Sequence, residues 1–552
     1  MGCTRPKNPT KSNFYFITIN SYFGAMQNTD GLLMKKLIIL LVIISFSVKL
    51  SKAQSVYLPY SYQLNQKFNS DVYSVESNLH TSLKPFLIDS TLAPTYNAIM
   101  NRGIDSGYKP WILRKIFNEH VFDVKTKDYT FYADYLPDLM LGRDFDDKIN
   151  THMNTRGFQL GGTIGSKFSF YSSGFENSAK FAGYYNDLVN KYAFIPGQAY
   201  NRNYNGIALG SQDWSYATAV ISYTPIKQLN ITLGTDKTFI GDGYRSLLLS
   251  DFAANYPLLR LTANIGPVQY MVMWAYLQDI NAVRFDNYGN NRRKWAAFHY
   301  LDWNVTNRLS LGVFNAVIAQ EADDNGTRHG FDANLVNPLF FASSIGPSAQ
   351  PDNVLAGFTG KYKIFDKTAV YGQLLMDNTN TDGYQLGIRG GDLFNVKGFN
   401  YLFEYNTVKP FAYTSPQIIT NYTYYSEPLG DPLGANFREF IAILNYSIGK
   451  FDFMGQVNYA KYGRNPAGQN YGNELTYTST SASTTETRVG QGVPTDFYFG
   501  EATASYLINP KYNLRFELGG LVRKETNDLG SRNTVQITFG LRSTFRAIYH
   551  DF

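Results

Sequence analysis

The sequence predicts an all-β fold: a transmembrane antiparallel β-barrel of about 18 strands, preceded by a small helical segment. Three observations lead to this prediction. Aromatic residues make up 16% of the chain, charged residues only 17%, and the mean hydropathy is −0.27. From Tyr129 onward, apolar and polar residues alternate with a period of two. Short turns rich in Gly, Pro, Asn and Lys separate the alternating runs.

Composition and charge exclude several classes of function. The formal net charge is +6 over 552 residues, which provides no polybasic surface and argues against nucleic acid as a partner. The single cysteine, Cys3, lies upstream of the expected mature chain, so we expect no disulfide and no thiolate site. The six histidines are scattered without metal-ligand spacing, so we expect neither a metal site nor a cofactor.

Residues 34–53 have the organisation of a secretory signal peptide. Two lysines form its basic region, the twelve residues Leu37 to Val48 its apolar region, and Ala53 ends a small-residue cleavage site. An apolar run of this length is too short to span a membrane as a helix. We therefore expect residues 1–33 to be a non-native upstream extension, the mature protein to begin at Gln54, and the outer membrane to be its destination.

Residues 54–128 are predicted to form a small, mostly helical segment in the periplasm or in the barrel lumen. The clearest helix begins at Lys109-Pro110-Trp111, because proline is tolerated in the first turn of a helix. A second short helix, interrupted by Pro85 and Pro94, is expected within 82–100. The first helix carries one apolar stripe, for which the periplasmic end of the barrel is the nearest partner. The stripe consists of Ile112, Leu113, Ile116, Phe117 and Val121.

Residues 129–552 are predicted to form the barrel. In one run Phe158, Leu160 and Ile164 alternate with polar residues and glycine, and similar runs recur along the chain. Apolar side chains that face lipid and polar side chains that face a wet lumen produce this alternation. A soluble β-sandwich would produce it as well. The export signal and the aromatic last residue, Phe552, favour the barrel.

Eight short turns each join two alternating runs, and they determine the strand count. Eight hairpins, with one strand before them (129–141) and one after them (533–545), give 18 strands. An even number places both ends of the chain on one side, and the short turns identify that side as periplasmic. The turns lie at 164–167, 224–227, 265–267, 304–307, 365–367, 395–398, 448–450 and 509–511. The long extracellular connections are expected at 177–212, 239–255, 278–294, 318–352, 407–436 and 461–494.

No catalytic motif is present in the sequence. It contains no nucleophile elbow, no phosphate-binding glycine loop and no zinc-protease helix. His299 and His329 are the candidates that an outer-membrane hydrolase would offer, but isolated histidines are more often structural. We therefore predict that the protein is not an enzyme.

Three of the long connections carry more apolar and aromatic residues than a solvated loop needs: 239–251, 334–341 and 422–437. We expect them to fold into the mouth of the barrel. Two interpretations stay open: inward packing without a ligand, or a sugar-binding surface of tyrosine rings and polar groups. For the second interpretation, the candidate contacts are Asp242, Arg245, Tyr422, Tyr424, Tyr425, Asn436 and Arg438.

Several motifs together resemble the Wzi family of capsule-assembly outer-membrane proteins, and most of all its Bacteroidota branch. They are Asn154-Thr155-Arg156-Gly157, Ile195-Pro196-Gly197-Gln198, Gly241 to Asp251 with Pro257, Asn337-Pro338, and Pro432 to Phe437. Within them, the loop-motif candidates are Gly241, Gly243, Asn337, Pro338, Pro432 and Gly434. The resemblance spans roughly residues 110–552. It implies an eighteen-stranded barrel with a helical periplasmic segment, association of capsular or exopolysaccharide with the cell surface and, for some members, a role in gliding.

The expected function is therefore an outer-membrane barrel, embedded in outer-membrane lipid, that associates with or displays surface polysaccharide. Gliding or polysaccharide-export proteins are the expected protein partners. Two alternatives stay open. The barrel could be a porin-like or fatty-acid transport channel whose loops only set the pore width, or a structural partner of a secretion or motility complex.

Overall fold

The computed structural model describes residues 56–105, 107–202, 210–282, 292–322, 327–329, 333–338, 353–377 and 382–552. The expected upstream extension, the signal peptide and Cys3 lie outside these residues and stay predictions, as does the mature start at Gln54. Parts of three predicted loops, 177–212, 278–294 and 318–352, also lie outside the described residues.

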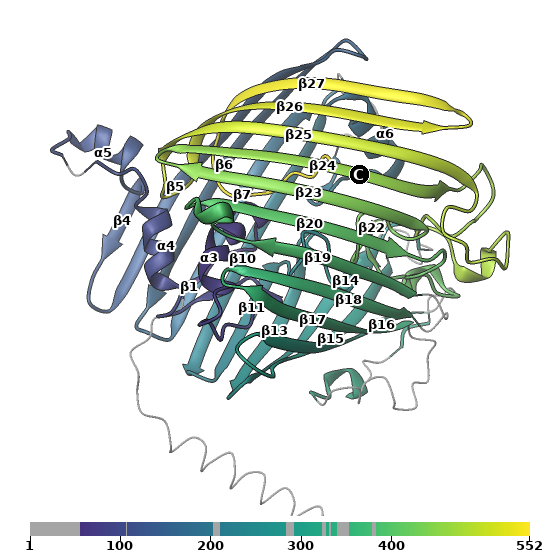
Figure 1. The fold of residues 1–552 in the computed structure, drawn as a ribbon, viewed down its shortest axis with the longest axis horizontal. Coiled ribbons are helices and arrows are strands. Elements are labelled where there is room, and N and C mark those ends of the chain that lie inside the picture. Colours follow the sequence, from purple (N-terminus) through teal and green to yellow (C-terminus); the bar gives the residue numbers. More distant parts are fainter. Residues whose placement is uncertain are drawn as a thin grey trace, which may run out of the picture. The chain divides into compact units, whose positions relative to one another are not determined.

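The chain forms a closed antiparallel barrel of eighteen strands, as predicted (Figure 1). Consecutive strands pair with one another, and β27 pairs with β5 to close the ring. A short strand, β4 (Phe122–Lys125), adds to the beginning of β5. The barrel strands are β5 (Tyr129–Asp144), β6 (Ile149–Ile164), β7 (Phe168–Lys180), β10 (Gln212–Ile226), β11 (Leu229–Asp236), β13 (Tyr256–Ile265), β14 (Val268–Asp279), β15 (Arg292–Asn304), β16 (Leu309–Gln320), β17 (Asn353–Phe365), β18 (Thr368–Asp377), β19 (Asp382–Gly390), β20 (Phe399–Val408), β23 (Phe437–Ile448), β24 (Phe451–Arg464), β25 (Val493–Asn509), β26 (Leu514–Asn527) and β27 (Gly530–Arg542).

All eight predicted turns join consecutive strands at one end of the barrel. The long connections leave the opposite end, together with three short connections, after β5, β18 and β26, that the alternation did not reveal. Long loops mark the extracellular end of outer-membrane barrels, so the eight turns are periplasmic. The first strand ends at Asp144 and not near 141, and the last strand covers Gly530–Arg542 and not 533–545.

The outer face of the wall is apolar because successive side chains of a strand point to opposite faces. Phe158 and Leu518 are each 54% exposed on this outer face, whereas Gln159 and Leu521, one and three residues away, are buried in the lumen. None of the helices in the described part of the chain has the length and apolar character needed to cross a membrane.

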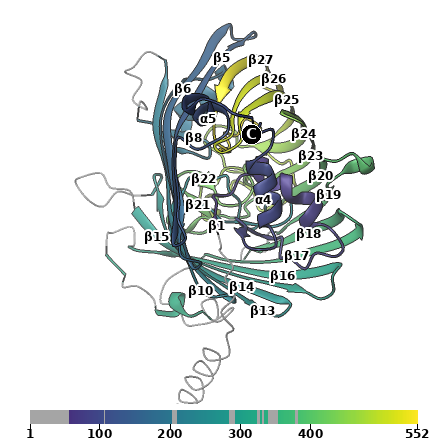
Figure 2. The same ribbon diagram turned by 90° about the vertical axis from the view of Figure 1, so that its left-hand side faces the viewer.

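The first described part of the chain, residues 56–100, lies inside the barrel, and we call it the plug (Figure 2). Lys67 forms an ion pair of 2.9 Å with Asp452 beside a periplasmic turn, and Tyr57 donates a 2.6 Å hydrogen bond to Asp236 at the far end of β11. The plug also has an apolar cluster of its own, which includes Phe68. Its elements are β1 (Val56–Tyr57), α2 (Tyr62–Asn65), η1 (Gln66–Phe68), α3 (Asn69–Val72), β2 (Leu83–Lys84), β3 (Leu87–Ile88) and α4 (Ala93–Met100).

Helix α5 (Trp111–Phe117) begins after Pro110, as predicted, but the expectation that its apolar stripe packs against the barrel was wrong. Ile112 of the stripe is 60% exposed, and only Phe117, the last residue of the helix, joins an apolar cluster of the wall. Asn509 in a periplasmic turn donates hydrogen bonds to main-chain carbonyls at the end of the helix. The helix is therefore held at the edge of the periplasmic opening, while the plug occupies the opening itself.

The chain turns inward after β27 and ends inside the barrel. Residues 543–552, which we call the tail, reach helix α6 (Gly183–Tyr192) at the extracellular end, where Tyr184 donates a 2.9 Å hydrogen bond to the carbonyl of His550. The ring of Phe552 is buried, 5.3 Å from that of Tyr185. The aromatic last residue therefore does not end a lipid-facing strand, and this reason for predicting a barrel was wrong although the barrel itself is present.

Candidate functional site

The connection between β11 and β13 enters the lumen and meets the plug. Its short strand β12 (Phe239–Ile240) pairs with β2 of the plug. The buried carboxylate of Asp242 accepts hydrogen bonds from three plug side chains, those of Tyr73 (2.8 Å), Thr81 (2.5 Å) and Ser82 (2.6 Å). Burial lowers the pKa of Lys84 to about 7, while the neighbouring Asp242 acts to raise it. Asp242 thus fastens an extracellular loop to the plug.

Two glycines of this connection are required by close packing. Gly241 has a φ of +134°, and a Cβ there would lie 2.1 Å from the side chain of Gln373. At Gly243 a Cβ would lie 2.2 Å from a carboxylate oxygen of Glu404. Any side chain at either position would push the connection away from the wall. The loop-motif glycines therefore serve the inward fold of the loop.

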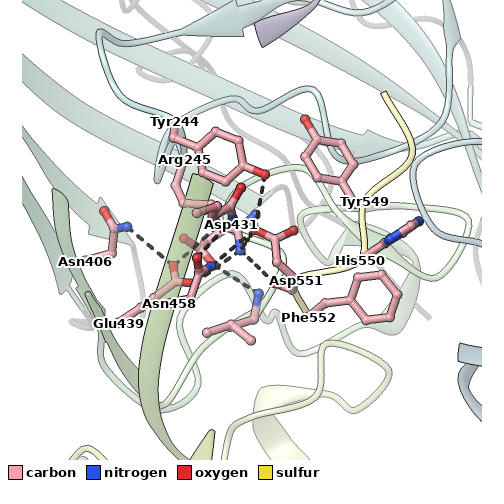
Figure 3. A network of polar contacts seen from close by, with 12 residues as sticks. Tyr244, Arg245, Asn406, Asp431, Glu439, Asn458, Tyr549, His550, Asp551 and Phe552 are labelled. Atoms are coloured by element: carbon pink, nitrogen blue, oxygen red, sulfur yellow. Dashed lines mark hydrogen bonds and ion pairs between the residues drawn. The ribbon is translucent and has the colours of Figure 1, made fainter. Parts of the chain in front are cut away.

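Arg245 lies at the centre of a buried polar network that joins three parts of the chain (Figure 3). Its guanidinium is 3.1 Å from Glu439 of β23 and 3.0 Å from Asp551 of the tail. The main-chain N–H groups of Tyr244 and Arg245 both donate to Glu404 of β20. A buried charge is tolerated only when it is paired and hydrogen-bonded. Arg245 is therefore a structural ion-pair residue of the lumen.

The connection between β20 and β23 also enters the lumen and covers the β11–β13 connection. It contains η4 (Ile418–Thr420), β21 (Thr423–Tyr424) and β22 (Glu427–Pro428). Tyr413 and Tyr422 stack at 5.7 Å and donate hydrogen bonds to the carbonyls of Leu247 and Leu248. Tyr422 and Tyr424 are buried, and Tyr425 packs its ring 4.7 Å from that of Phe194. These three tyrosines therefore contact protein.

The remaining two candidates from this region have different surroundings. Asn436 is buried, has a φ of +61°, and donates hydrogen bonds to the carbonyls of Gly463, Tyr471 and Gln491, so it joins two long loops. Arg438 lies next to the lumen residue Glu439 in β23 and therefore points to the outer face of the barrel, where it is exposed. Neither side chain lies free at the mouth of the barrel.

The described piece of the β16–β17 connection lies against the outside of the wall. Trp274 donates a 2.6 Å hydrogen bond to the carbonyl of Leu335, and Tyr270 donates one of the same length to the carbonyl of Pro338. Asn337 and Pro338 therefore do not reach the mouth, and Phe340 and Phe341 lie outside the described residues. Among the described residues, no group of three side chains has the arrangement of a metal site.

A cavity of about 370 Å³ lies at the extracellular end of the lumen. Helix α6, the β20–β23 connection and the inward-facing ends of β24 and β26 surround it, and Phe552 of the tail contributes to its lining. The loop-motif residues Pro432 and Gly434 also line it. The aromatic and charged side chains of the lining are Tyr184, Asp187, Lys191, Tyr192, Phe194, Phe252, Glu427, Tyr462, Arg464, Glu474, Arg523, Glu525, Arg532 and Phe552.

The lining combines tyrosine rings with ion pairs of both signs. Arg464 and Arg523 contact Glu525 at 2.6 and 2.7 Å, and Lys191 contacts Glu474 at 2.9 Å. The side chains of Lys191 and Arg464 are about half exposed, which places them at the rim of the cavity. Most of these residues lie in long connections whose composition did not single them out, such as Tyr184 and Tyr192 in 177–212 and Glu474 in 461–494. The lining residues of β24 and β26 occupy inward-facing positions at the extracellular ends of these strands. The alternation of inward and outward residues along the strands was the signal that could have identified them.

A second cavity of about 80 Å³ lies between the plug and the wall. Six tyrosines contribute to its lining, among them Tyr60, Tyr132 and Tyr171. Asp251 lines this lower cavity and the next residue, Phe252, lines the upper one, so the β11–β13 connection separates them. The described residues thus close the lumen with the plug, two inward-folded loops and the tail.

These features define an eighteen-stranded outer-membrane barrel that is closed from within and carries a polar, aromatic cavity at its extracellular end. The sequence model of the family described as "Capsule assembly protein Wzi" matches residues 144–508, well over half of the chain, and the chain belongs to this family. A search of curated proteins found no match.

Two solved structures that resemble the chain come from proteins described as outer-membrane proteins. One is Wzi of Escherichia coli, described as an outer-membrane protein involved in group 1 capsule assembly and as a carbohydrate-binding β-barrel. It is 14% identical, with a TM-score of 0.52 over 89% of this chain and 100% of that one. Another is OprD of Pseudomonas aeruginosa, which is 10% identical, with a TM-score of 0.41 over 74% of this chain and 94% of that one.

Proposed function

We propose that the protein binds surface polysaccharide in its extracellular cavity, without catalysis, and so keeps capsular or exopolysaccharide at the cell surface. The observation that carries the proposal is this cavity of about 370 Å³, lined by Tyr184, Tyr192 and Tyr462 and by paired arginines and glutamates. Membership of the capsule-assembly family and the carbohydrate binding reported for the Escherichia coli protein support it.

The chemistry of the cavity suits sugar rings. The apolar faces of sugars pack on tyrosine rings, whose hydroxyl groups stay available for hydrogen bonds. Carboxylates accept hydrogen bonds from sugar hydroxyls, and guanidinium groups donate to them. A concave site with apolar walls and a few oriented polar groups is the usual form of a ligand site. We include the cavity tyrosines among the contacts, whereas Asp242, Arg245, Tyr422, Tyr424 and Asn436 would support the site by holding its loops.

The test replaces Tyr192 and Tyr462 together by alanine. Each ring is expected to contribute about 1 kcal/mol, so the affinity for purified surface polysaccharide should fall by roughly tenfold or more. The matched control replaces Tyr459 and Tyr498, a pair 4.9 Å apart on strands β24 and β25 whose rings point outward. Binding is measured by calorimetry and retention of glycan on cells by antibody staining. Equal binding by both double variants, at equal barrel abundance, would refute the proposal.

The closed lumen favours binding over transport. The plug, the tail and the connections after β11 and β20 all occupy the space through which a porin would conduct. We therefore expect near silence in planar-bilayer recordings. A large, steady open current would support the porin-like or fatty-acid channel instead.

A link between this protein and gliding motility is also a proposal. The resemblance of the sequence motifs to the Bacteroidota branch of the family, and within it to the gliding-motility protein RemB, suggests that the bound glycan takes part in surface spreading. A deletion strain complemented with the Tyr192/Tyr462 double variant tests this link. If it spreads like wild type while its glycan retention falls, the role is capsule association alone. If neither changes, and gliding proteins co-purify with the barrel, the structural-partner alternative is favoured.

A further inference from the structure

Five cations lie on the outer face of the barrel, near the extracellular ends of their strands. They come from β23, β24, β26, β5 and β7, which belong to one continuous stretch of the wall that also contains β25, β27 and β6. We call this set the cation half-ring. Its members are Arg438, Lys461, Lys524, Arg143 and Lys180.

The outward direction of these side chains follows from their neighbours in the strands. Arg438 precedes Glu439, which contacts Arg245 in the lumen, and Lys524 follows Arg523, which contacts Phe552. Lys180, Arg143 and Lys461 each lie beside a residue that is fully buried on the inner face. Adjacent residues of a strand point to opposite faces, so all five cations point away from the lumen.

The half-ring borders the lipid-facing band of the wall. Two positions closer to the periplasm in the same strands, and on the same face, lie Leu141 (70% exposed), Val522 (54%) and Phe440 (44%). The long loops leave the barrel at this same end, so the border is that of the outer leaflet. Cations at this depth lie where the hydrocarbon ends and lipid headgroups begin.

The protein neutralises little of this charge. Within the part of the chain that the structure describes, Lys180, Arg438 and Lys524 form no ion pair. Lys461 pairs with Asp496 at 3.2 Å, with side chains that are 60% and 42% exposed. Even with this pair counted as neutral, the half-ring keeps a net positive charge.

From this arrangement we infer that the half-ring binds the phosphate groups of an anionic glycolipid in the outer leaflet. Arginine forks match phosphate oxygens in bidentate geometry, and lysine adds a compact positive charge. The apolar band directly below receives the acyl chains of the same molecule. The occupant is thus a lipid that combines acyl chains with a phosphorylated headgroup. This inference concerns the outer wall and is independent of glycan binding in the cavity.

The experiment reverses three members of the half-ring: Lys180→Glu, Arg438→Glu and Lys524→Glu. The matched control reverses three exposed lysines of periplasmic turns: Lys167→Glu, Lys227→Glu and Lys397→Glu. Proteins are extracted from outer membranes in mild detergent, and co-purified phosphorylated glycolipid is quantified by mass spectrometry. Wild type and control should retain the lipid and the half-ring variant should lose most of it. Equal retention by all three would overturn the inference.

A second measurement separates the sources of phosphate and does not depend on the folding of the reversed variant. Delipidated wild-type protein is titrated with phosphorylated lipid A, with phosphatidylglycerol vesicles and with inorganic phosphate while its thermal unfolding is followed. Lipid A should raise the unfolding temperature most, and the neutral variant Lys180→Gln, Arg438→Gln, Lys524→Gln should lose this shift. An equal shift with inorganic phosphate would indicate a soluble-anion site, and an equal shift with phosphatidylglycerol an unselective lipid surface. Either result would refute the inference.

Discussion

The guanidinium of Arg245 lies 3.0 Å from the carboxylate of Asp551, the penultimate residue of the chain. The pair joins the tail to a loop that enters the barrel from the extracellular end. Glu439 of the wall completes the contact at 3.1 Å from the same guanidinium. One buried arginine thus connects the tail, an inward-folded loop and the wall, and the closed lumen depends on it.

Replacing Arg245 by alanine should destabilise the barrel by about 3–5 kcal/mol, because Glu439 and Asp551 would be left buried without a cation. The measurement is thermal unfolding in detergent, followed by heat-modifiable gel mobility. Arg464→Ala is the matched control. Its pair with Glu525 involves a side chain that is about half exposed, so the expected loss is about 0–1 kcal/mol. Equal losses in the two variants would contradict the role assigned to Arg245.

Deleting residues 544–552 should open the lumen, because the tail fills space between the plug and helix α6. We expect single-channel conductance in planar bilayers to rise well above the near silence expected of the intact protein. As a control, residues 485–488, which are exposed in the β24–β25 loop, are replaced by glycine and serine. A truncated barrel that inserts normally and stays silent would show that the plug and loops seal the lumen alone.

Asp242→Ala should loosen the plug, because the hydroxyl groups of Tyr73, Thr81 and Ser82 would lose their shared acceptor. The expected result is faster cleavage within residues 56–100 by a protease added to the purified protein. Asp105→Ala, which removes an exposed carboxylate just beyond the plug, should leave the cleavage rate unchanged. Identical rates in both variants would mean that Asp242 does not hold the plug.

Single cysteines can test the orientation of the barrel, since Cys3 is the only cysteine in the sequence. Thr480→Cys in the β24–β25 loop should react with an impermeant maleimide on intact cells. Lys450→Cys in the β23–β24 turn should react only after the outer membrane is permeabilised. Labelling of intact cells at position 450 but not at position 480 would reverse the orientation.

Processing provides a further prediction. The protein extracted from outer membranes should begin at Gln54, because the basic, apolar and cleavage regions of the signal peptide all refer to a start at Met34. Mass spectrometry of the N-terminal peptide decides this point. A peptide from residues 1–33 in the membrane fraction would refute the expected upstream extension.

The wall of the barrel was predictable because the period of two and the turn residues are local signals. All eight turns lie where the sequence placed them. The end of the last strand was not predictable from pattern, because residues beyond Arg542 continue the mixture of polar and apolar types while the backbone leaves the sheet. Only the packing of Phe552 in the lumen shows that residues 543–552 leave the sheet and do not extend β27.

The burial of the candidate site residues could not be predicted from the sequence. Asp242, Arg245 and Asn436 have side chains suited to a ligand, but their partners come from segments distant in sequence, so pattern alone could not reveal their burial. The face on which the Arg438 side chain lies depends on the register of β23. A shift of one residue would have turned the side chain inward, and only the pairing of β23 with β24 assigns it to the outer face. In both cases the deciding information is three-dimensional.

The tail also constrains the order of assembly. It enters by the periplasmic opening, which the plug occupies, and Phe545 packs against the apolar cluster of the plug. A seated plug would block the entry of ten further residues, so the tail must be drawn in before the plug settles or together with it. The tail therefore reaches its place in the lumen no later than the plug, and the seated plug then holds it there.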